Sequence, residues 1–154
     1  MSKTSVKEIH LIGLSLKTKT INTHGQSSID CKNLWHAFEN GNYAAAIPGK
    51  LSDEIYGVYH HYDGDSTKPF SYFVGCKVKK DTVAPKGLEG ITIPEGAYEK
   101  ITVKGKMPDC VINAWKEIWT ADYARTYQTD FEVYDERSKD WNHAEVDVYV
   151  SVEG

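Results

Sequence analysis

A carboxylate and a phenol stand two residues apart in the run Thr129–Tyr134, whose sequence is TDFEVY. Because side chains alternate across a strand, Glu132 and Tyr134 would share one face, and Phe131 and Val133 the other. The run contains no Lys or Arg that could neutralise the acid. In a groove walled by rings, such a carboxylate would pair with a ligand cation, and each well-placed ring would add roughly 0.5 to 2 kcal/mol of cation–π attraction. The alternative is a solvated outer face.

An earlier run, Ile55–Tyr59, repeats this pattern without the acid. When it is aligned with residues 130–134, Tyr59 meets Tyr134 and Gly57 takes the place of Glu132. A feature added to one copy of a repeat favours a role in function over a role in the scaffold. The repeat therefore makes Glu132 the first candidate for a binding residue.

Other aromatic residues are candidates for the walls of such a groove. Tyr59 and Tyr134 would share the face of Glu132, and Tyr149 would lie on the outward face of the last strand, with cross-strand packing as the alternative. Trp35 and Trp115 lie at the centres of apolar helical stripes, which favours the core or the groove floor, whereas Trp119 lies at a stripe edge. The predicted ligand-binding set is Glu132, Tyr134, Tyr59, Tyr149, Trp115, Trp119 and Tyr56.

The apolar spacing predicts the elements that must position these residues. Apolar residues at i, i+3, i+4 and i+7 predict one helix within residues 30–39 and a second that starts near Pro108. Alternating runs predict strands over 9–17, 55–62, 70–78, 98–103, 130–135 and 145–152. The order strand, helix, strand, strand therefore occurs twice.

This order predicts an α+β fold, a duplicated βαββ unit with pseudo-twofold symmetry. The sheet would be antiparallel, both helices would pack on one face, and a ligand groove would lie between the halves. We expect a single domain over 1–154, with repeats at about 6–80 and about 90–154 and a linker near 79–89.

Composition and motifs argue against several classes. A net charge of -4 with scattered Lys and Arg predicts no direct contact with nucleic acid. The sequence has neither an apolar run of roughly 20 residues nor a signal peptide, so we expect no membrane contact and a cytoplasmic location. The cysteines Cys31, Cys76 and Cys110 have no disulfide or zinc spacing and are expected to be small core residues.

No metal, cofactor or catalytic residue is predicted. His60 and His61 are adjacent in a predicted strand and would point to opposite faces, so they would not chelate together. The other histidines lack ligand spacing, and no nucleotide-binding or nucleophile-elbow motif occurs.

The ordered set of motifs resembles the GyrI-like effector-binding fold. The resemblance rests on residues 55–59, 70–75, 93–98 and 131–134, together with the helix of Trp115, and it extends over essentially the whole chain. This fold forms the ligand domain of many AraC-family and MerR-family multidrug-responsive regulators in bacteria. It also occurs in free-standing proteins, including those carried on integron gene cassettes. The resemblance implies that the acid of the FEVY run lies in the ligand cleft, a role that transfers to Glu132.

We therefore expect a non-enzymatic protein that binds amphipathic, cationic, drug-like compounds. Since the sequence before Ile9 has no room for a helix-turn-helix domain, it resembles a stand-alone member. Possible partners are a second copy of the chain or a separate DNA-binding regulator. One alternative is an inhibitor of a macromolecular target such as DNA gyrase; another is a small hydrolase of reactive compounds that uses Glu132 and a tyrosine.

Overall fold

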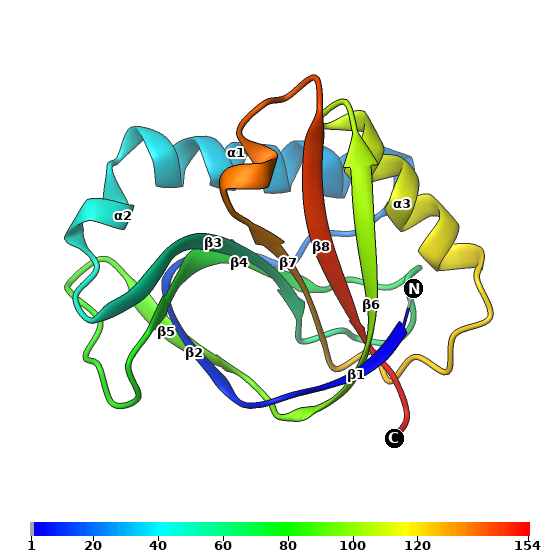
Figure 1. Cartoon of the computed structure of the whole chain (residues 1–154), viewed down its shortest axis with the longest axis horizontal. Coiled ribbons are helices and arrows are strands. Elements are labelled where there is room, and N and C mark those ends of the chain that lie inside the picture. Colours follow the sequence, from blue (N-terminus) through cyan, green and yellow to red (C-terminus); the bar gives the residue numbers. More distant parts are fainter. Residues whose placement is uncertain (1) are drawn as a thin grey trace.

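A computed structural model describes residues 2–154 and contains one curled antiparallel sheet with two long helices (Figure 1). The strands are β1 (Ser2–Val6), β2 (Ile9–Ser15), β3 (Lys50–His60), β4 (Ser71–Val78), β5 (Glu89–Ile93), β6 (Gly96–Gly105), β7 (Thr129–Tyr134) and β8 (Ala144–Ser151). The helices are α1 (Gln26–Asn40), the short α2 (Tyr43–Ala46) and α3 (Asp109–Thr120). Single turns of 3-10 helix lie at Thr23–Gly25 and Glu136–Ser138.

The predicted α+β duplication is confirmed. The eight strands follow the order β1-β6-β8-β7-β3-β4-β2-β5, so the halves β6-β8-β7 and β3-β4-β2 are mirror-ordered about a β7–β3 seam. Both α1 and α3 lie on the same side of the sheet (Figure 1). The two halves thus meet where the equivalent strands β3 and β7 pair.

The two edge strands are exchanged between the halves. β1 precedes the first half but pairs with β6, and β5 precedes the second half but pairs with β2. Sequence patterns do not predict β1, and for β5 they indicate only the short apolar run 91–93. Both strands are five residues long, so each depends on a partner that is distant in the sequence.

Both faces of the sheet are covered. On the face away from the helices, Phe131 and Val133 pack with Val58, Phe73 and Ile93 where the sheet curls over itself, which confirms the predicted apolar side of β7. On the helix face, α1 and α3 each cover an apolar cluster. Consequently Glu132 and Tyr134 face the two helices.

Of the three cysteines, Cys76 is buried as expected, whereas Cys31 and Cys110 are only partly buried. Cys76 is buried in the cluster under α1, and all three cysteines are free thiols. Across residues 2–154 the helices are too short or too polar to cross a lipid bilayer.

Candidate functional site

A cavity of about 980 Å³ lies between α1 and α3, above the seam of β3 and β7. It is lined by side chains of both helices, of β3, β4 and β7, and of the loop that follows β7. This volume is in the range of small-molecule sites, which often form between repeated halves. Glu132 contributes to its floor.

Three neutral donors hold the Glu132 carboxylate. Trp115 donates its indole Nε1–H to Oε2 at 2.6 Å, and the Tyr59 hydroxyl donates to the same oxygen at 2.9 Å. The Tyr134 hydroxyl donates to Oε1 at 2.7 Å. Only 1% of Glu132 is exposed. The site therefore fixes both oxygens of a buried acid without a positive charge.

Further rings pack around these donors. The Tyr72 hydroxyl accepts a hydrogen bond of 2.8 Å from Trp35 Nε1. Ring centroids lie 4.7 Å apart for Tyr59 and Tyr72, and 4.8 Å apart for Tyr59 and Trp115. Trp35 meets the ring of Tyr134 edge-on at 4.8 Å. Both halves of the fold thus supply aromatic walls around one acid.

Gly57 makes room for this acid. It pairs directly with Glu132 in the β3–β7 register. A Cβ atom on residue 57 would lie 2.3 Å from the Tyr72 hydroxyl and 3.0 Å from Glu132 Oε1. The asymmetry between the two repeats is therefore spatial, because the carboxylate occupies the space that a second side chain at the seam would need.

Burial controls the protonation of the whole cluster. Burial raises the pKa of the Glu132 carboxyl above its ordinary value, and the hydrogen bonds from Trp115, Tyr134 and Tyr59 offset part of the rise. Burial, followed by the charge of Glu132, raises the pKa values of Tyr59, Tyr72 and Tyr134 well above 10. The tyrosines are therefore protonated and act as donors at neutral pH.

A second buried acid on β7 has a different environment. Asp130 is fully buried, and its Oδ2 pairs with Arg125 Nη2 at 2.8 Å. It also accepts hydrogen bonds from Tyr62 and Ser151. In contrast, the ion pairs of residues 2–154 do not include Glu132. Glu132 is thus the buried acid of β7 that lacks a counter-charge.

The ionisable lining of the cavity is mostly acidic. The lining acids are Glu39, Asp53, Glu54, Glu132, Asp135 and Glu136, and the lining bases with a permanent charge are Lys32, Arg125 and Lys139. Since Arg125 is paired with Asp130, the field in the cavity favours a cation.

The structure brings four of the predicted residues together: Glu132, Tyr134, Tyr59 and Trp115. Trp119, a residue of α3, lines the same cavity and packs, partly buried, against the apolar cluster beneath that helix.

Two predicted residues lie elsewhere. Tyr56 and Tyr149 are on the opposite face of the sheet, in or against the cluster around Phe131. The Tyr149 ring stacks on Phe131 with centroids 4.6 Å apart, and Tyr56 is 5% exposed beside the same ring. They pack the core and do not contact Glu132.

Sequence reasoning missed Tyr72 and Arg125 and left Trp35 outside the predicted ligand-binding set. Tyr72 was not predicted as a site residue, although it pairs with Tyr59 across β3 and β4. Trp35 was expected in the core or groove floor, and its indole N–H anchors Tyr72. A buried indole needs an acceptor, which is a usable signal. Arg125 lies in a loop without periodicity, and the sequence offers no signal for it.

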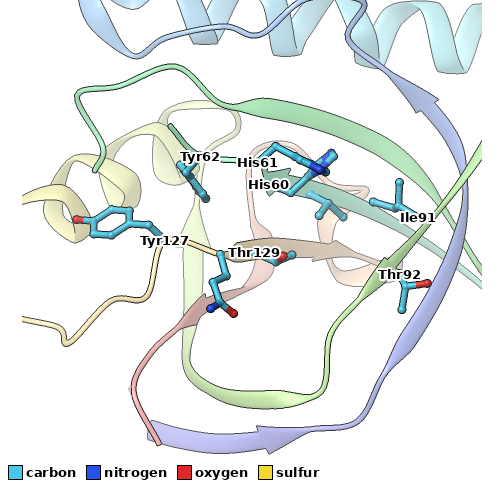
Figure 2. A pocket seen from close by; sticks show the side chains of 9 residues that line it. His60, His61, Tyr62, Ile91, Thr92, Tyr127 and Thr129 are labelled. Carbon is cyan, nitrogen blue, oxygen red and sulfur yellow. The ribbon is translucent and has the colours of Figure 1, made fainter. Parts of the chain in front are cut away.

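His60 and His61 do not point apart as expected. His61 follows the end of β3 with a φ of 52°, which turns its ring back until the two Nδ1 atoms lie 2.5 Å apart. The pair lines a smaller cavity of about 520 Å³ with Ile91, Thr92 and Thr129 (Figure 2). Burial lowers the pKa of His60 to about 4, so the His60 imidazole is uncharged at neutral pH. No cluster of three metal-ligating side chains occurs within residues 2–154.

Comparisons with known proteins agree with this architecture. Residues 4–152 match a family model, Cass2, described as integron-associated effector binding protein. The candidate transcriptional regulator YobU of Bacillus subtilis (strain 168) is 30% identical over 123 residues, which is 77% of each protein.

Two solved structures are similar over nearly the full length. The integron cassette protein VCH_CASS2 from the mobile metagenome of Vibrio cholerae has 28% identity and a TM-score of 0.70, over 99% of this chain and 95% of that one. SAV2435, solved bound to tetraphenylphosphonium, has 16% identity and a TM-score of 0.78, over 99% of this chain and 93% of that one.

Proposed function

Since the chain belongs to the Cass2 family of integron-associated effector binding proteins, we propose that it binds amphipathic cationic small molecules in the cavity between α1 and α3. In this proposal Glu132 is the counter-charge, and the rings of Tyr59, Tyr134 and Trp115 surround the cation. Trp119 contributes to the wall. The ligand is held and released without chemical change.

The observation that carries the proposal is the buried, unpaired carboxylate. Burying an ionised acid without a counter-charge is costly, and neutral donors recover only part of that cost. A cation that enters the cavity would pair with Glu132 in a medium of low dielectric, where the attraction is much stronger than in water. The protein is therefore poised to gain free energy from a ligand that carries positive charge.

Shape and surroundings support the same ligand class. The volume of about 980 Å³ suits a drug-sized molecule, and flat aromatic walls favour an apolar ligand with a delocalised charge. Acids outnumber bases among the lining residues, which attracts cations to the entrance. SAV2435, which shares this fold, was solved with the lipophilic cation tetraphenylphosphonium.

A binding role also fits the state of the tyrosines better than catalysis does. Because their pKa values are raised, Tyr59 and Tyr134 stay protonated at neutral pH and are poor general acids, and both hydroxyls already donate to Glu132. Bound compounds should consequently be recovered unchanged after long incubation, as chromatography would show.

The test is the substitution Glu132→Gln, which removes the charge and keeps the side-chain volume. Tetraphenylphosphonium would be titrated into wild type and variant, with quenching of tryptophan fluorescence as the signal. We expect affinity to fall by about tenfold or more, since a pair formed in a buried site is worth at least ~1.4 kcal/mol. Glu117→Gln, which removes an exposed acid from α3, is the matched control and should bind as wild type. Equal affinity in wild type and Glu132→Gln would refute the role of Glu132.

A further inference from the structure

Arg125 is buried beside the candidate site but uses little of its hydrogen-bonding capacity. It lies between α3 and β7, with 4% of its side chain exposed, and lines the same cavity as Glu132. One nitrogen, Nη2, donates to Asp130 Oδ2 at 2.8 Å. The Cζ atom of the guanidinium lies over the ring of Tyr127, 4.2 Å from its centroid. One face and one nitrogen of the guanidinium are thus occupied.

The remaining donors of Arg125 are orphaned. Nε and Nη1 are buried and have no hydrogen-bond partner among residues 2–154. Buried donors of a charged group are rarely left unpaired unless something else uses them. These two nitrogens lie on different sides of the guanidinium, and a two-pronged carboxylate would also need Nη2, which donates to Asp130. Each orphaned nitrogen can therefore donate a charge-assisted hydrogen bond to one acceptor oxygen of a ligand.

Asp130 does not accept hydrogen bonds from these two orphaned nitrogens. Its Oδ2 accepts from Arg125 and, at 2.6 Å, from the Tyr62 hydroxyl. Its Oδ1 accepts from the backbone N–H of Ser151 at 2.8 Å and from the Ser151 hydroxyl at 3.1 Å. The aspartate is therefore satisfied with one nitrogen of Arg125. The ion pair with Asp130 therefore leaves the buried Nε and Nη1 donors unexplained.

Glu132 and Arg125 lie near one another along the floor of the cavity, with Asp130 between them in the chain. Alternation puts Asp130 and Glu132 on one face of β7, with Cα atoms roughly 7 Å apart. Arg125 extends the row beyond Asp130. Arg125 lines the main cavity, while Tyr62, which binds Asp130, and Tyr127, which contacts Arg125, line the smaller cavity (Figure 2). The guanidinium therefore lies where the two cavities approach each other.

We propose that Arg125 forms a second subsite that takes a hydrogen-bond acceptor, a carboxylate in the strongest case, from the same ligand whose cation pairs with Glu132. This inference rests on the proposed function and narrows the ligand class to amphipathic zwitterions and cations that carry an acceptor. The side chains that cover Nε and Nη1 must move to admit such an acceptor.

The sign of the effect makes the proposal testable. In a cavity with an acidic lining, a carboxylate added to a cationic ligand should weaken binding by repulsion. If Arg125 receives that carboxylate, binding should instead strengthen. Tetraphenylphosphonium and (4-carboxyphenyl)triphenylphosphonium differ by this group alone and are the probes.

The experiment measures both dissociation constants for wild type, Arg125→Lys and Arg137→Lys. Lysine at position 125 keeps a positive charge for Asp130 but has no donors at the positions of Nε and Nη1. We expect wild type to bind the carboxylate probe more tightly than tetraphenylphosphonium. In Arg125→Lys the ratio of the two dissociation constants should shift by about tenfold toward tetraphenylphosphonium. Arg137, the other arginine, does not line the cavity itself and pairs with Asp135, Glu145 and Asp147. Its lysine variant keeps the positive charge beside Asp135 and should retain the wild-type preference between the two probes.

A ligand series on wild type covers the case in which Arg125→Lys fails to fold. The methyl ester of the carboxylate probe should bind about tenfold more weakly than the acid, because it loses the charge-assisted bonds. An unchanged ratio between the two cations in Arg125→Lys, or an ester that binds as well as the acid, would overturn the subsite and leave the proposed function standing. Failure of both cations to bind wild type would overturn the two together.

Discussion

Replacing Gly57 by alanine tests the geometry of the seam directly. The new methyl group would lie 2.3 Å from the Tyr72 hydroxyl, so that hydroxyl must move by about 1 Å to reach ordinary contact at 3.4 Å. Such a move lengthens its bond from Trp35 and crowds the Glu132 carboxylate. An added methyl in a packed interior typically costs about 1 to 3 kcal/mol, and a weakened hydrogen bond about 1 kcal/mol more.

Alanine also recovers about 0.5 to 1 kcal/mol in a strand, because it restricts the unfolded chain. The net expectation is a loss of about 2 kcal/mol in the free energy of unfolding. For a chain of this length that corresponds to a Tm lower by about 4 to 8 °C. Affinity for tetraphenylphosphonium should fall as well, since the carboxylate is displaced from its donors.

Urea unfolding followed by tryptophan fluorescence provides the measurement. Gly90→Ala is the matched control, because its Cβ would meet only the Leu11 carbonyl at an ordinary 3.6 Å. The control should stay within about 0.5 kcal/mol of wild type. The reasoning is refuted if Gly57→Ala is as stable as wild type, or if both variants lose the same amount.

Three further outcomes follow from the buried acid. Affinity for tetraphenylphosphonium, measured by equilibrium dialysis, should fall as pH is lowered through the raised pKa of Glu132, and should be flat with pH in Glu132→Gln. Tyr134→Phe removes a donor and should move the midpoint of that titration to higher pH; a lower midpoint would contradict the hydrogen bond. Because folding raises this pKa above 4.5, the cost of the ionised acid is absent below 4.5 and complete above the raised value. The free energy of unfolding of Glu132→Gln minus that of wild type should therefore increase with pH. Urea unfolding of both proteins on either side of this pH window measures the difference, and a difference that decreases with pH would contradict the prediction.

The sequence predicts the fold well because its signals are local and doubled. Each half repeats an alternating strand pattern and a helical stripe, and the aligned repeats put Gly57 in register with Glu132. The structure turns this alignment into a contact, since β3 and β7 are equivalent strands that pair antiparallel at the seam. The edge strands β1 and β5 escape prediction because their only partners lie in the other half.

The site is predicted less completely because the face of the sheet on which a side chain lies, and the residues it meets there, depend on the strand register. Alternation already separates Tyr56 from Tyr59 on β3, but an excess of tyrosines does not say which of them meet the acid. Tyr149 faces Phe131 through a β7–β8 register that one sequence does not reveal. Arg125 is positioned by a buried ion pair from a loop, so neither periodicity nor a motif marks it.

The exchange of edge strands also affects how the chain can fold during synthesis. Ser2 pairs with Lys100 and Val6 with Gly96, so β1 leaves the ribosome long before its partner exists. β5, in contrast, finds β2 already made. At translation rates of roughly 5 to 20 residues per second, β1 waits for several seconds with its backbone unpaired. Completion of the sheet at β1 is therefore a late step that requires the second half, and a nascent chain halted before β6 should carry an exposed, protease-sensitive N-terminal segment.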